Sequence, residues 1–133
     1  MPPRRRVDPN EMRAAVAAVA PWLADPWAED AAQRPSRAET ASAVKLSLRT
    51  LEAVAPGRTV EVRVPPFAAV QCVAGPEHTR GTPPNVIETD ARTWLLLATG
   101  RLDFPAAVES GLVSASGSRA DLTPWLPLVR VEG

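Results

Sequence analysis

Few side chains in this chain could carry out chemistry, because the sequence holds one histidine, one cysteine and no tyrosine. His78 follows Glu77 and precedes Arg80 by two positions, in a stretch rich in turn-forming residues. It can therefore scaffold a loop, contact a polar head group or act as a base. Cys72 lies six positions earlier, in an expected strand, where a thiol typically behaves as a small buried hydrophobe. We expect no cysteine–histidine nucleophile.

The motifs that would hold a metal, a cofactor or a nucleophilic serine are missing from the sequence. It has no C-x-x-C or H-x-x-x-H spacing for a metal, and no G-x-G-x-x-G or G-K-[ST] loop for a nucleotide. Ser114 and Ser116 lie in G-L-V-S-A-S-G, which indicates a strand and not the sharp strand-to-helix turn of a nucleophile elbow. The sequence thus predicts no intrinsic catalysis, no cofactor and no metal.

Length and composition limit the class of protein. With 133 residues, 45% of them hydrophobic, we expect one domain over residues 9–133, preceded by a disordered basic end at residues 1–8. A net charge of zero argues against a nucleic-acid partner. A single cysteine excludes an internal disulfide and fits a reducing cytoplasm. No apolar run approaches the ~20 residues of a membrane span, so we expect no stable membrane insertion, although transient contact stays open.

Hydrophobic periodicity and turn residues predict the order of helices and strands. Ser36 and Glu39 form a capping box before the most regular helical pattern. The expected strand at 67–74 is nearly apolar on both faces, which predicts cover on both sides. The expected elements are helices at 9–20 and 36–55, strands at 59–64 and 67–74, a polar loop at 75–84, a strand at 85–88, two short helices and a strand before residue 117, and a short closing helix within 118–129.

The most closely spaced signals lie between Glu88 and Gly117. Asp90 and Asp103 are candidate N-caps of two short helices. Gly100 and Gly111 can end those helices in the left-handed conformation. The first helix is apolar on all sides, so it must be covered on all sides.

This segment resembles the C-terminal half of the sterol carrier protein type 2 family. The matching residues are T-G-R-L at 99–102 and the G-L-V-S-A-S-G strand at 111–117, and the resemblance covers roughly residues 85–129. Residues 56–84 look more like an actinobacterial branch, the bacterial sterol carrier orthologue domain. The resemblance implies an α+β fold, with a mostly antiparallel sheet of four to five strands covered by helices, here with two N-terminal helices added.

The resembled fold leaves a hydrophobic tunnel between its sheet and its C-terminal helices. Each apolar side chain of that region can therefore serve either as packed core or as cavity lining. A carboxylate or phosphate at the tunnel mouth would meet His78 or Arg80, our candidate head-group residues. The candidate cavity residues are Phe67, Val70, Val86, Trp94, Leu95, Ala98, Leu102, Phe104, Val108, Leu122, Trp125, Leu126 and Val129.

These expectations together predict non-catalytic binding or carriage of a fatty acid, an acyl-CoA or another lipid by a cytoplasmic monomer or weak homodimer. One alternative is an accessory module of a thiol-dependent isomerase-like or acetyltransferase-like system. Residues 1–55 hold no histidine or cysteine, so such a system would need its catalytic domain on a partner chain. The other alternative is a structural protein with a filled core, which would interact with partners through Trp22, Trp27 and the first helix.

Overall fold

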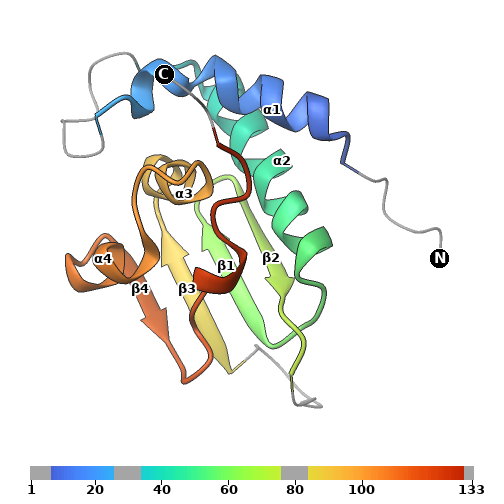
Figure 1. Cartoon of the computed structure of the whole chain (residues 1–133), viewed down its shortest axis with the longest axis vertical. Coiled ribbons are helices and arrows are strands. Elements are labelled where there is room, and N and C mark those ends of the chain that lie inside the picture. The colour runs from blue at the N-terminus through green and yellow to red at the C-terminus, as the bar shows by residue number, and fades with distance from the viewer. Residues whose placement is uncertain (1–6, 26–33, 76–83, 131–133) are drawn as a thin grey trace.

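The structure is a computed structural model that describes residues 7–25, 34–75 and 84–130. Within these ranges, helices and 3-10 turns lie around a four-stranded sheet (Figure 1). In chain order the elements are α1 (Pro9–Ala18), η1 (Ala20–Leu23), α2 (Arg37–Val54), β1 (Val60–Val64), β2 (Ala68–Cys72), β3 (Asn85–Thr89), α3 (Ala91–Ala98), α4 (Phe104–Glu109), β4 (Val113–Ser116) and η2 (Thr123–Trp125).

Short polar side chains start the helices, as the sequence predicted. The Ser36 hydroxyl accepts a hydrogen bond from the Glu39 amide at 3.1 Å, and the Glu39 carboxylate accepts one from the Ser36 amide at 3.0 Å. At the starts of α3 and α4, the Asp90 and Asp103 side chains accept hydrogen bonds from the amides of Thr93 and Ala106. Gly100 follows α3 with a φ of +76°, so the predicted left-handed helix end is confirmed.

The sheet has the strand order β2-β1-β3-β4. Its outer pairs, β1 with β2 and β3 with β4, are antiparallel, whereas the central pair of β1 and β3 is parallel. The α+β class and the sterol-carrier-like arrangement are confirmed, and the described part of the chain contributes four strands.

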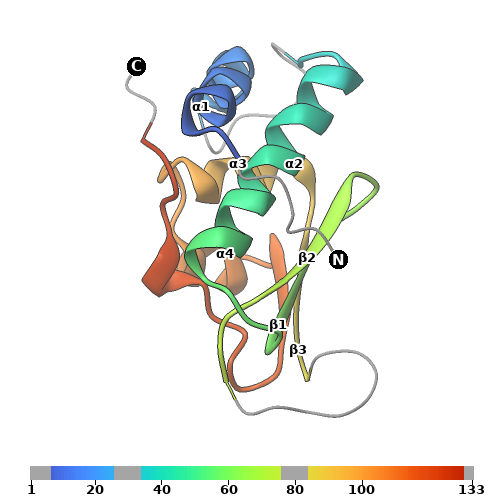
Figure 2. The same cartoon turned by 90° about the vertical axis from the view of Figure 1, so that its right-hand side faces the viewer.

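All helices of the described ranges lie on one side of this sheet. Figure 2 shows the strands on one side of the molecule, with α2 and the residues around η2 beside their inner face. Alternation along the strands sends Val62 and Ile87 toward the helices, and sends Glu61 and Glu88 to the opposite face. We call the first side the covered face and the second the open face.

The prediction that the second strand is covered on both sides is wrong. β2 is an edge strand whose Val70 and Cys72 are buried on the covered face, while Ala69 is exposed and Gln71 partly exposed on the open face. Small and polar side chains suffice on the open face because none of the described helices packs there. The near-apolar pattern reflected small side chains and not a buried position.

The core forms beneath α2 and α3. Every residue of α3 is buried, so the complete cover expected for this apolar helix is confirmed. The Trp94 indole, which is fully buried there, donates a hydrogen bond to the Ser47 hydroxyl of α2 at 2.8 Å. A buried polar group that keeps a partner avoids the cost of desolvation.

We call residues 118–130 the C-terminal tail, and no regular closing helix forms in it. Only the 3-10 turn at Thr123–Trp125 is helical, because Pro124 and Pro127 lack the amide hydrogen that an α-helix needs. The tail instead runs extended across the covered face (Figures 1 and 2). The amides of Leu128 and Val129 both donate to the Ala98 carbonyl, at 2.9 and 3.1 Å.

Candidate functional site

Most of the predicted cavity residues lie together in one continuous core cluster on the covered face. Val70, Trp94, Leu95, Ala98, Leu102, Phe104 and Leu122 are all buried in it. The structure therefore brings the apolar candidates into one place. It gives them the contacts of a core, so their role in lining a ligand cavity stays a prediction.

Phe67 and two residues of the C-terminal tail occupy the rim of this cluster. Phe67, Trp125 and Leu126 are partly buried and pack against it. Val129 belongs instead to a small second cluster, with Met12 and Val16 of α1. Helix α1 thus contacts the end of the tail, so the N-terminal and C-terminal segments are held against each other.

Two predicted cavity residues lie away from the covered face. Val86 alternates with the buried Asn85 and Ile87 of β3, so its side chain is on the open face. Val108 projects from α4 with 37% of its surface exposed. Neither side chain faces the layer between sheet and helices in which the tunnel was expected.

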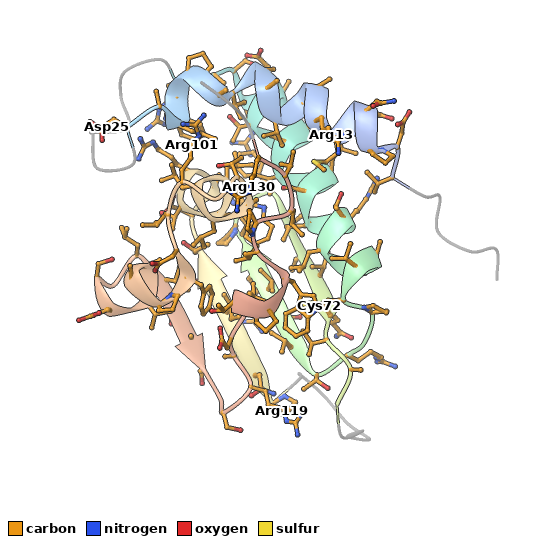
Figure 3. The ribbon with its side chains drawn as sticks, viewed as in Figure 1. Arg13, Asp25, Cys72, Arg101, Arg119 and Arg130 are labelled. Atoms are coloured by element: carbon orange, nitrogen blue, oxygen red, sulfur yellow. The ribbon has the colours of Figure 1, made fainter. Side chains whose placement is uncertain are left out.

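Among the residues that can react, His78 and Arg80 lie outside the described residues. Cys72 is buried on the covered face (Figure 3), and desolvation, with a smaller contribution from the charge of Glu52, raises its pKa to about 12. A thiol with that pKa is protonated at neutral pH and is a poor nucleophile. In the described ranges no three His, Cys, Asp or Glu side chains gather closely enough to hold a metal ion.

A pocket that the sequence did not predict lies where four segments meet. Its volume is about 340 Å³. We call it the arginine pocket, because it contains three arginines and one acid among its lining residues. They are Trp22, Arg34, Pro35, Arg37, Thr40, Pro65, Pro66, Phe67, Asp90, Ala91 and Arg92.

Arg92 is fixed at the wall of this pocket. Its side chain is 9% exposed, its Nε donates to the Trp22 carbonyl at 3.1 Å, and its Nη2 donates to the Asp25 carbonyl at 2.7 Å. These bonds tie η1 and the residues after it to the first turn of α3. The guanidinium therefore adopts one orientation and does not sweep through solvent.

Arg37 and Phe67 form a second part of the wall. The Arg37 Cζ lies 5.3 Å from the centroid of the Phe67 ring, within range of a cation–π contact. Phe67 also packs against the core cluster. One ring thus connects the hydrophobic core to the arginine pocket.

The sequence holds one signal for this pocket, which is the placement of Arg37 and Arg92. Arg37 is the first residue of α2 and Arg92 the second of α3, at helix ends where the dipole disfavours a positive charge by about 0.3–1 kcal/mol. Side chains that oppose a local preference often mark a functional site. The remaining lining residues come from distant segments, which no local pattern connects.

A second depression of similar volume, about 340 Å³, lies beside the C-terminal tail. Arg13 of α1 and residues 127–130 line it, and Figure 3 shows Arg13 and Arg130 on the same part of the molecule. It lies beside the second cluster and marks the contact between α1 and the tail.

The described helices include none long and apolar enough to cross a membrane.

Comparison with known proteins gives one finding beyond this geometry. A family model described as a bacterial SCP ortholog matches residues 36–128. The match begins at the N-cap of α2 and ends within the C-terminal tail, so it contains the whole sheet and leaves α1 and η1 outside. No curated protein matches the chain.

Proposed function

The chain belongs to the bacterial SCP ortholog family, and on this premise we propose that it binds and carries a hydrophobic small molecule on the covered face of its sheet. Family membership confirms the resemblance found in the sequence and indicates a lipid-binding or carrier role in general. A fatty acid, an acyl-CoA or another lipid is the ligand class we expect. The ligand would lie between the sheet, α3 and the C-terminal tail, and the protein would act in the cytoplasm without chemistry of its own.

The observation that carries this proposal is the construction of the tail. Its side chains at Trp125, Leu126 and Leu128 cover the core cluster but stay partly exposed. The two backbone hydrogen bonds that tie residues 128 and 129 to α3 both end on the Ala98 carbonyl. A segment with little regular structure that covers an apolar surface can move aside for an apolar ligand at small cost in hydrogen bonds.

The free energies expected for binding a lipid chain suit a carrier. A chain of about sixteen carbons gains on the order of 10 kcal/mol when buried at ~0.8 kcal/mol per methylene. Association costs of ~4–15 kcal/mol absorb much of that gain. The tail also loses its own contacts when a ligand replaces it. The net affinity is then moderate and reversible, as delivery of the ligand requires.

The test is displacement of a pyrene-labelled dodecanoate from the purified full chain, together with native mass spectrometry for ligands that co-purify. We expect the labelled acid to bind and unlabelled hexadecanoate to displace it. Trp125→Ala enlarges the space beneath the tail, so it should change the affinity for the labelled acid at least about threefold.

Val108→Ala is the matched control, because Val108 is apolar but exposed on α4. It should leave the affinity unchanged. The proposal fails if no ligand co-purifies and the labelled acid does not bind, or if both variants bind it as the natural chain does.

The filled-core alternative loses one of its expected anchors. Trp22, which that alternative required at an interaction surface, is only 6% exposed, and its backbone carbonyl accepts a hydrogen bond from Arg92. Trp27 lies outside the described residues. Carriage of a ligand therefore remains the function that the family and the tail support best.

A further inference from the structure

The arginine pocket brings three arginines together near the starts of α2 and α3. Arg34, Arg37 and Arg92 line it, and Asp90 is the one acid among the lining residues that the structure describes. Helices α1 and α2 have an acid in their first turn, Glu11 and Glu39, whereas α3 has none and carries Arg92 there. We propose that the arginine pocket binds an organic anion, whose carboxylate or phosphate meets the arginines while an attached apolar group lies on the aromatic wall.

Arg37 has the geometry to receive such a group. The Phe67 ring supports its guanidinium through a cation–π contact, which does not consume its N–H hydrogens. Those hydrogens lie in the guanidinium plane, where they match a carboxylate or phosphate in bidentate fashion. Because Arg37 is already placed by Phe67, binding costs it little conformational freedom.

Arg92 contributes a charge that is nine-tenths buried and cannot move away. Its bonds to the carbonyl groups of Trp22 and Asp25 hold the guanidinium against the pocket. A fixed charge in a partly buried site attracts an anion more strongly than a charge in bulk solvent does. It also confines the anion to one position.

Caps already occupy one amide at each of the two helix starts beside the pocket. The Ser36 hydroxyl already accepts the Glu39 amide at the start of α2. Both carboxylate oxygens of Asp90 are engaged by Thr93, one by its amide at 2.9 Å and one by its hydroxyl at 2.8 Å. Each cap therefore occupies one amide of its helix, at Glu39 and at Thr93, and Asp90 is directed toward its own helix.

The remaining lining residues of the pocket indicate that the ligand has an apolar part. Trp22, Pro65, Pro66 and Phe67 give the pocket an apolar and partly aromatic lining. A volume of about 340 Å³ fits a head group with a short chain or a ring, at the lower end of the range for small-molecule sites. Inorganic phosphate would fill only part of it.

This site is separate from the one proposed beneath the C-terminal tail, since no tail residue lines the pocket. The inference therefore does not rest on the proposed function. The two sites can be distinguished by which amide signals a ligand perturbs.

The experiment titrates the full chain with octanoate, octyl phosphate, 1-octanol and inorganic phosphate, followed by amide chemical shifts and calorimetry. We expect octanoate and octyl phosphate to shift the amides of Arg37, Phe67 and Arg92, and inorganic phosphate to bind more weakly at the same amides. Added salt should weaken all three anions, because Arg37 is exposed to solvent. 1-Octanol should leave these amides unshifted.

Arg37→Gln keeps a polar side chain but removes the charge, and it should raise the dissociation constant for octanoate about tenfold, the usual size of a lost hydrogen bond to a charged group. Arg49→Gln is the matched control, because Arg49 is exposed on the same helix and does not line the pocket. The inference is overturned if 1-octanol shifts the pocket amides as octanoate does, or if the two variants bind octanoate equally. If octanoate shifts only amides of the tail, this inference is wrong and the proposed function is still supported.

Discussion

Cys72 lies on the covered face of β2 with its side chain buried, and its chemistry follows from that position. Removal from water raises its pKa from 9.0 to about 12, and the nearby charge of Glu52 adds to the shift. The native thiol therefore holds its proton where an unfolded thiol has already lost it. Above pH 9 the unfolded state binds fewer protons than the native state, so the free energy of unfolding falls as pH rises from about 9 toward 12.

We therefore expect Cys72 to react slowly with iodoacetamide in the native protein. At pH 8 the thiolate fraction of a group with a pKa near 12 is about a thousandfold below that of an ordinary thiol, apart from any steric protection. Reaction rates in native buffer and in denaturant measure the difference. Cys72→Ala should also flatten the stability profile above pH 9. Equal labelling rates in the two buffers would show that the thiol is accessible and ionisable.

At the scale of single residues, the sequence predicted the features that depend on residues close together in the chain. Asp90, Asp103 and the Ser36–Glu39 pair were recognisable as caps, because a cap and its partner lie two or three positions apart. The arginine pocket was missed because Trp22, Phe67 and Arg92 are remote in the chain, and only the folded sheet and helices bring them together.

Among the elements, the C-terminal tail departs most from its sequence pattern. Its apolar residues recur at intervals that suit a helix, but the prolines remove two amide hydrogens and leave one short 3-10 turn. Apolar contacts along the tail hold it in position instead. Its middle packs on the core cluster, and Val129 packs against Met12 and Val16 of α1.

Helix α1 should therefore stabilise the closed position of the tail. Val16→Ala removes two methyl groups from the second cluster, and it should accelerate hydrogen exchange at the Leu128 and Val129 amides at least about tenfold, with little change in β1. Hydrogen exchange followed by nuclear magnetic resonance measures both regions. Ala17→Ser on the exposed side of α1 is the control. Unchanged exchange at Leu128 in the Val16 variant would show that the tail is held without α1.

In the whole molecule, the helices that the structure describes lie on one side of the sheet. This arrangement gives the two faces different tolerance to substitution, although both carry aliphatic side chains. The one-sided cover of the sheet was only partly predictable. Alternation of valines with charged residues identified the open face of β1, whereas the small residues of β2 suggested cover on both sides. Pairing order, and with it the edge position of β2, depends on contacts that no local pattern encodes.

Adjacent residues of β3 offer a matched test of this one-sided arrangement. Ile87→Ala removes a fully buried side chain and should lower the free energy of unfolding by about 2–5 kcal/mol. Val86→Ala, on the open face, should change it by only about 0.5 kcal/mol or less. Denaturant titration of both variants measures the difference. A loss at Val86 as large as that at Ile87 would mean that something covers the open face.

The parallel pairing of β1 with β3 has a consequence for the order of folding. β1 and β2 can pair as a local hairpin, and β3, α3, α4 and β4 form a second continuous unit. The parallel pairing of β1 with β3 joins these two units and places Val60 opposite Asn85. It can form only when the chain between these two residues closes into a loop. Contacts of that separation form slowly, so we expect the two units to take shape first and the central pairing to form last. The covered face, and any site built on it, then exists only after the final step of folding.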